Sequence, residues 1–257
     1  MVTNKDRAKI PRQATTRMEA LLVKHIDRFN NILVGVSISK DLFSLNNKLI
    51  KDKVKNLDRM LENEIYNLIL SYSHYKIDAD EDQEDLMAFI LRDRGDDNLV
   101  SLIRKYTQRL DDEIEAYIES SLYFDISIRE GLNALKKDLK NAYTSPFIRK
   151  AYKDVEKPNS TILKLSGMTV KDGQYKTSIA NIKRLAAFTI IEAFTFRQHS
   201  SFLNMGAIGY TSHRGSDYYC PYCDSMTKFY PIDDPTGLPP YHANCYCYIT
   251  PVYINED

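Results

Sequence analysis

The chain has 257 residues and carries 35 basic and 35 acidic side chains, so its formal net charge is zero. This length can bury one large core or two modest ones. No segment approaches the ~20 consecutive apolar residues that span a bilayer, so the sequence predicts no membrane-spanning helix. Residues 1–12 are charged and lack the apolar segment of a signal peptide, which favours a reducing cytoplasm as the protein's location.

The first predicted helix follows Thr16-Arg17-Met18-Glu19, which has the pattern of a capping box. Its apolar residues recur three and four positions apart, as expected for one buried face. They are Met18, Leu21, Leu22, Ile26, Phe29, Leu33 and Val36. His25 lies on this face, where a lone histidine is more often a satisfied core residue than a ligand, so the sequence assigns it no role.

Further helices are predicted over residues 41–72, 99–118 and 128–139, from apolar positions with the same spacing. The first of these would be longer than ~40 Å, which is more than a compact globule needs. The acidic segment from Ile77 to Asp85 lacks the glycine of an EF-hand loop, so we expect a solvated turn that leads into a helix. Residues 1–157 are therefore predicted to form an elongated helical region.

Residues 158–205 are expected to contain a linker or hairpin, marked by the turn dipeptide Asp172-Gly173, and then one helix. That helix, from Ser178 to about Phe202, is apolar on nearly every side, which predicts burial on all sides. Glu192 and Arg197 within it could form a buried pair. Since long charged side chains usually extend to solvent, we expect both to extend to the surface.

Residues 206–257 are predicted to form a small β module with strands near 207–212, 228–232 and 246–254. All four cysteines of the protein lie there. Cys220-Pro221-Tyr222-Cys223 is followed by 18 residues and then by His242-Ala243-Asn244-Cys245-Tyr246-Cys247. A CxxC pair that faces an HxxCxC cluster is typical of a tetrahedral zinc site.

Two disulfides or four free buried thiols are the alternatives to a metal site, and a reducing location with clustered cysteines disfavours the disulfides. Five candidate ligands compete for four positions: Cys220, Cys223, His242, Cys245 and Cys247. A catalytic zinc keeps one position open, so surplus ligands favour a closed, structural zinc. The sequence leaves open which four residues bind. Without the metal, we expect a module of some fifty residues to bury too little apolar surface to fold.

The zero net charge conceals blocks of opposite sign. Residues 76–125 contain 6 basic and 15 acidic side chains, whereas residues 126–205 contain 14 basic and 6 acidic ones. Such blocks suit docking onto charged partners, although a solvated helical bundle can acquire them by chance. The basic block keeps DNA contact open as a secondary role.

The end of the chain resembles the minor head proteins of the phage Mu F type, also called head morphogenesis proteins of tailed phages. The resemblance covers about residues 178–252 and depends on an apolar helix, Gly206-Ala207-Ile208-Gly209-Tyr210, the CxxC pair, Pro239-Pro240 and the HxxCxC cluster. The chain departs from the family at Ala243, where the family has Pro, and at Tyr246, where it has Arg. Phe188-Thr189-Ile190 stands where the family often has Arg-Thr-Glu.

The resemblance implies a non-enzymatic virion protein of low copy number that binds near the portal vertex, assembles in the host cytoplasm and contacts portal and other capsid proteins. It implies a role in head assembly or DNA delivery. Family members with a fused toxin domain carry it after the motif, and none is expected in the five residues after Val252.

Two other classes of protein are alternatives to a phage head protein. A zinc-ribbon nucleic-acid-binding protein is disfavoured by the acidic excess of residues 206–257. A metal-dependent nuclease or hydrolase would use His213 or His242 at an open metal position. The fold class predicted overall is mainly α with a small α+β C-terminal module.

Overall fold

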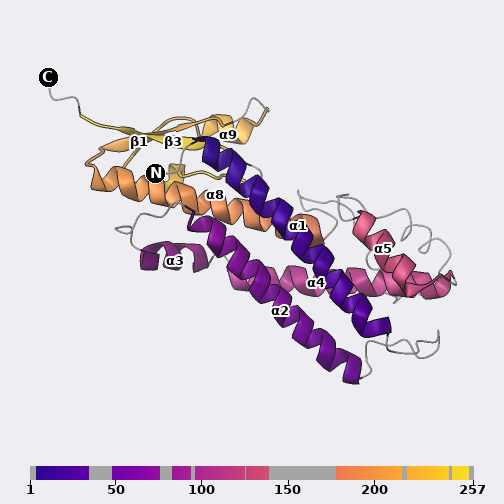
Figure 1. Ribbon diagram of the computed structural model, residues 1–257. Coiled ribbons are helices and arrows are strands. Elements are labelled where there is room, and N and C mark those ends of the chain that lie inside the picture. The colour runs from indigo at the N-terminus through magenta and orange to yellow at the C-terminus, as the bar shows by residue number, and fades with distance from the viewer. Residues whose placement is uncertain are drawn as a thin grey trace. The chain divides into compact units, whose positions relative to one another are not determined.

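The computed structural model describes residues 4–34, 48–75, 83–93, 96–124, 126–138, 178–215, 219–242 and 245–254 (Figure 1). It is mainly helical, with a three-stranded antiparallel sheet near the C-terminus, which confirms the predicted fold class. The chain divides into two compact units. The sheet unit comprises Met1–Thr16, Asn67–Leu99 and Arg184–Asp257, and the helical unit comprises Arg17–Tyr66 and Val100–Lys183.

Six helices of eight or more residues lie in the described part of the chain. They are α1 (Asn4–Val34), α2 (Lys48–Ser73), α3 (Gln83–Leu91), α4 (Leu99–Tyr123), α5 (Ile128–Asp138) and α8 (Ser178–Asn204). None of these described helices combines the length and apolar character needed to cross a bilayer. The hairpin or linker predicted at 158–177 lies outside the described residues, as do residues 77–82 of the acidic segment, whose end begins α3 as expected. The elongated shape predicted for residues 1–157 stays a prediction.

Helix α1 begins twelve residues before the capping box that the sequence suggested, so that prediction is wrong. The Thr16 hydroxyl lies inside the helix and donates to the carbonyl oxygen of Arg12 at 3.0 Å. The apolar face continues backward through Ala14 and Ile10, which form a buried cluster with Ile190 and Phe194 of α8. Burial of this extended face keeps the chain helical although Pro11 lies within it.

The helical unit buries the apolar faces that the sequence predicted. Its fully buried side chains include Leu22, Ile26 and Phe29 of α1, Leu61 and Ile65 of α2, Leu110, Ile114 and Ile118 of α4, and Leu132 of α5. Polar contacts join neighbouring helices around this core. Arg28 of α1 donates both guanidinium ends to Glu64 of α2 at 2.7 and 2.8 Å. Lys136 of α5 pairs with Asp27 of α1.

The N-terminus of α8 is capped from another helix. The backbone N–H of Ser178 donates to Glu113 Oε1 of α4 at 2.6 Å, and the Ser178 hydroxyl donates to Oε2 at 2.8 Å. Glu113 is only 5% exposed, so burial raises its pKa to about 7. A buried carboxylate here satisfies helix N–H groups that have no partner within α8.

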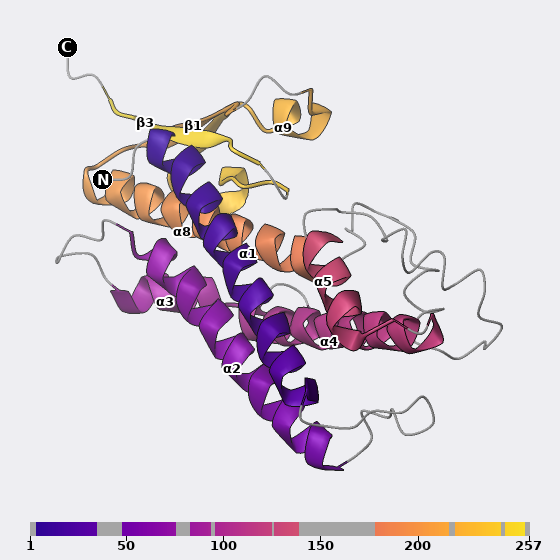
Figure 2. The same cartoon turned by 45° about the vertical axis from the view of Figure 1, so that its right-hand side comes forward.

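In the sheet unit, β1 (Gly209–His213) is the central strand, and β2 (Phe229–Pro231) and β3 (Tyr248–Val252) are its antiparallel neighbours. All three lie within the predicted segments or one residue beyond them. The sheet lies beside the C-terminal half of α8 (Figures 1 and 2). Phe202 of α8 joins the buried cluster of the sheet, whose other members are Ala207, Tyr210, Tyr230 and Ile249. The module therefore shares an apolar cluster with Phe202 of α8, and the expectation that it needs a metal to fold stays a prediction.

The burial predicted for α8 is confirmed, but the expectation for its charged residues is wrong. Glu192 is 8% and Arg197 is 7% exposed. Glu192 pairs with Arg92 at 2.7 Å, and Arg197 donates to the carbonyl oxygen of Tyr75 at 2.8 Å. These partners lie about a hundred residues away in sequence, so the local pattern could not reveal them.

Candidate metal centre

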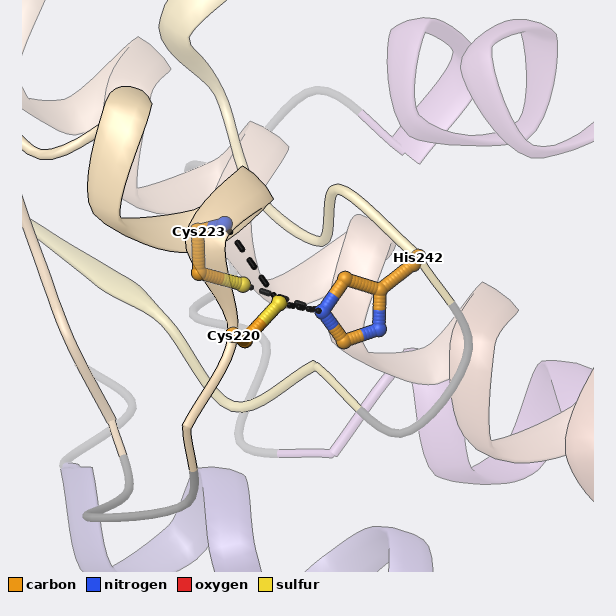
Figure 3. A group of neighbouring side chains, drawn as sticks. All are labelled: Cys220, Cys223 and His242. Carbon is orange, nitrogen blue, oxygen red and sulfur yellow. Dashed lines mark hydrogen bonds between the residues drawn. The ribbon is translucent and has the colours of Figure 1, made fainter.

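The CxxC pair lies at the start of a short helix, α9 (Pro221–Ser225). Cys220 is its N-cap, and the Cys220 sulfur accepts a hydrogen bond from the backbone N–H of Cys223 at 3.5 Å. Pro221 occupies the first turn, where its missing N–H is not needed. This turn directs both sulfur atoms to the same side, where they point toward the ring of His242 (Figure 3).

The HxxCxC cluster meets the CxxC pair from the segment that leads into β3. His242 Nε2 lies 3.3 Å from the Cys220 sulfur and 3.0 Å from the Cys223 sulfur. The sulfur atoms of Cys223 and Cys245 are 3.8 Å apart. The ligand atoms form two groups, Cys220 with Cys223 and His242, and Cys223 with Cys245 and Cys247, each within 4.8 Å of one another. Cys223 belongs to both groups and is the centre of the cluster.

These distances fit a tetrahedral metal. With Zn–S near 2.3 Å and Zn–N near 2.0–2.1 Å, the edges of the tetrahedron are about 3.8 Å between sulfurs and about 3.6 Å between sulfur and nitrogen. The distance of 3.8 Å between the Cys223 and Cys245 sulfurs equals that edge, whereas the sulfur–nitrogen distances of 3.3 and 3.0 Å are shorter than theirs. Cys223, Cys245 and Cys247 are at most 3% exposed, so solvent has little access to the sulfurs. The five predicted residues therefore come together as a cluster that can hold a metal ion.

A hydrogen bond between two of the thiols shifts their pKa values in opposite directions. A hydrogen bond from the Cys247 thiol lowers the pKa of Cys245 to about 5, and the same bond raises the pKa of Cys247. Burial raises the pKa of Cys223 to about 12. The metal-free cluster therefore favours one thiolate, on Cys245, with protons on its buried neighbours. A metal that binds here must displace those protons.

One residue that the sequence analysis missed is Arg7 of α1, which is buried beside the cluster and only 2% exposed. Its guanidinium donates to the carbonyl oxygen of Cys247 at 2.9 Å. It also donates to Thr195 Oγ1 and Gln198 Oε1 of α8, both at 2.6 Å. A metal with three thiolates or more has a net negative charge, which a buried cation offsets.

The signal for Arg7 is present in the sequence. Continuing the apolar spacing of α1 backward from Met18 through Ala14 places position 7 on the buried face. A charged residue at a core-facing position needs a buried partner, which marks it as functionally or structurally specific.

His213, the other histidine considered for chemistry, belongs to β1 and not to the cluster of described metal ligands. Its Nε2 lies 2.7 Å from Thr250 Oγ1, and its ring stacks on Tyr248 at 5.1 Å between centroids. The structure therefore gives His213 a place in the sheet.

Comparison of the chain with protein-family models, with curated proteins and with solved structures finds no match. The resemblance to phage minor head proteins consequently depends on the motif residues themselves and on how they meet in space.

Proposed function

We propose that the protein is a structural minor head protein of a tailed phage, an adaptor that binds near the portal vertex during capsid assembly or DNA delivery. One observation carries the proposal. The CxxC pair and the HxxCxC cluster, which carry the resemblance, come together as a group that could hold a metal ion, and the preceding apolar helix packs on the same sheet through Phe202. Motif residues that lie close together in space support the resemblance better than matching residues in the sequence alone.

The metal in this proposal is one structural Zn²⁺ per chain, bound by Cys220, Cys223, His242 and either Cys245 or Cys247. Thiolates and imidazole are the donors that zinc prefers in closed tetrahedral sites. Protein side chains then fill all four positions, which leaves none for a substrate or a reactive water. A closed site supports a stabilising role for the metal and a protein without catalytic turnover.

The surface of the sheet unit supports an adaptor that binds other proteins. Eight of the eleven exposed large hydrophobic side chains of the described residues lie between positions 203 and 254. Tyr219 is 79% and Ile254 is 69% exposed. Exposed aromatic and aliphatic side chains provide the apolar area that protein-binding surfaces use. We therefore place the contact with the portal or capsid on this unit.

Co-expression with a portal protein from the same genome tests the proposal. We expect the protein to co-purify with the portal ring at low and at high salt, and to be present in purified particles. The double substitution Tyr219→Ser and Ile254→Ser should weaken binding at least about tenfold, because it removes apolar contact area. Met60→Ser is the matched control, since Met60 is 48% exposed on α2 of the helical unit.

Two outcomes would overturn the proposal. One is the absence of the protein from purified particles together with no portal association at either salt concentration. The other is cleavage of DNA by the purified protein with added zinc or magnesium, which would favour the metal-dependent nuclease. Salt-sensitive DNA binding without portal binding would favour the nucleic-acid-binding alternative.

A further inference from the structure

A second cluster of ligand-type side chains lies in the helical unit. His25 of α1, Asp58 of α2 and Asp111 of α4 come from three different helices, and their ligand atoms all lie within 4.8 Å of one another. The His25 side chain is fully buried, and its Nε2 is 3.8 Å from Asp111 Oδ1. The Asp111 side chain is 18% exposed.

The histidine is not the satisfied core residue that the sequence favoured. Neither ring nitrogen of His25 has a hydrogen-bond partner, although the ring is fully buried. Oδ1 of Asp58 and Oδ1 of Asp111 are likewise buried without a partner. Buried polar atoms in proteins are nearly always hydrogen-bonded, so unpaired atoms on three residues whose ligand atoms lie within 4.8 Å of one another indicate a missing binding partner.

The protonation states of the three residues suit a cation. Burial lowers the pKa of His25 to about 4, so its imidazole is neutral at physiological pH and has a lone pair to donate. Burial raises the pKa of Asp58 and of Asp111 to about 7, and a hydrogen bond joins the two carboxyl groups.

We propose that His25, Asp58 and Asp111 form a second metal site, which binds a divalent first-row transition metal such as Mn²⁺. One imidazole nitrogen with two carboxylate oxygens is a harder donor set than the thiolate cluster, and it suits Mn²⁺, Fe²⁺ or Zn²⁺. Two carboxylates and a neutral imidazole balance the charge of the ion. Side chains that project inward from facing helices are a common way to build such sites in helix bundles.

The surroundings provide an entry path. Asp58 lines a cleft of about 610 Å³ between α2 and α4, together with polar residues that include Glu62, Arg104 and Gln108. An ion can therefore reach the carboxylate of Asp58 from solvent, and the cleft has room for the water molecules that complete its coordination. The site would join α1, α2 and α4 and so stabilise the helical unit.

Mn²⁺ is the probe for the test because thiolate sites disfavour it. The full-length protein, first saturated with Zn²⁺ at the cysteine cluster and freed of excess zinc, is titrated with Mn²⁺, and free Mn²⁺ is measured by electron paramagnetic resonance. We expect about one Mn²⁺ per chain. Asp58→Asn and Asp111→Asn should each weaken binding tenfold or more, as loss of a charged ligand does. Asp112→Asn is the control with the same charge change at the adjacent, exposed position of α4.

A second measurement keeps the proposal open to refutation if a variant misfolds. Pulsed paramagnetic resonance of Mn²⁺ bound to the wild-type protein should show coupling to a ¹⁴N nucleus of His25, and the coupling should persist in His242→Asn. The proposal is overturned if the wild-type protein binds no Mn²⁺. It is also overturned if bound Mn²⁺ shows no nitrogen coupling, or if folded Asp58→Asn and Asp111→Asn bind as tightly as Asp112→Asn. The three residues would then form only a buried polar cluster.

Discussion

Arg7→Met is the most informative single substitution, because it removes a buried cation and keeps the apolar stem. The substitution deletes three hydrogen bonds, to the Cys247 carbonyl oxygen, Thr195 Oγ1 and Gln198 Oε1. Their lengths are 2.6 to 2.9 Å, as expected for charge-assisted bonds. The three acceptors then stay buried without this donor.

Two opposing contributions determine how much Arg7→Met lowers the free energy of unfolding. Removing one partner of a buried charged network costs about 3–5 kcal/mol, because polar partners remain buried. Methionine also removes a guanidinium that was expensive to bury, which offsets part of that loss. We expect the free energy of unfolding to fall by about 3 kcal/mol. For a chain of this size that corresponds to a melting temperature lower by about 6–12 °C.

Zinc retention is the second readout. Residues that support metal ligands through hydrogen bonds commonly change affinity by about 10–100-fold. Arg7→Met should therefore lose zinc to a chromophoric chelator at a concentration at least about tenfold lower than the wild-type protein does. Arg12→Met is the matched control, since Arg12 is exposed on the same helix. Equal zinc retention in Arg7→Met and Arg12→Met would refute the assignment of Arg7 to the metal centre.

Three further substitutions test other parts of the account. Burial raises the pKa of Glu113 from 4.5 to about 7, so between these values the folded protein keeps a proton that the unfolded chain has released. Stability should therefore fall as pH rises from about 4.5 to 7 in urea titrations, at up to about 1.4 kcal/mol per pH unit. Glu113→Gln should flatten that dependence, and an unchanged slope would contradict it. In Gly215→Ala the new Cβ would lie 1.7 Å from the carbonyl oxygen of Tyr246, so chelators should remove zinc faster than from the wild-type protein. Gly206→Ala is the control and should not change that rate, because nothing lies within 4 Å of its new Cβ. Cys223→Ser should abolish zinc binding, yet the backbone amides of β1 should stay protected from hydrogen exchange, because the sheet shares an apolar cluster with Phe202 of α8. Global unfolding in that variant would show that the cluster is insufficient.

Local patterns predicted what local forces determine. The CxxC pair and the HxxCxC cluster are each compact in sequence, so their spacing alone indicated five ligands that the fold indeed gathers. The apolar faces of the long helices were predictable for the same reason, since their period is set by helix geometry. The positions of helix N-caps were harder to predict, because the four-residue capping-box pattern also occurs by chance inside helices. Thr16 to Glu19 fits the pattern inside a helix, whereas the capping box that forms joins Ser127 and Glu130 at the start of α5.

The remaining features depend on residues far apart in sequence. Arg7 lies 240 positions from Cys247, and Glu192 lies 100 from Arg92, so no window along the chain contains both partners. The grouping of His25 with Asp58 and Asp111 likewise exists only once three helices pack together. In the sequence, each of Arg7, Glu192 and His25 lies on a predicted buried helix face, which indicates that it needs a buried partner. The sequence does not indicate which residue that partner is.

Zinc K-edge X-ray absorption of the protein purified without chelator tests the central claim, a closed structural zinc at the cysteine cluster. We predict one zinc per chain, with three sulfur neighbours near 2.3 Å and one nitrogen neighbour near 2.0–2.1 Å. A zinc content far below one equivalent would contradict the claim. So would a spectrum with fewer than three sulfurs and a water oxygen in the coordination sphere, because such a site keeps the open position that catalysis requires.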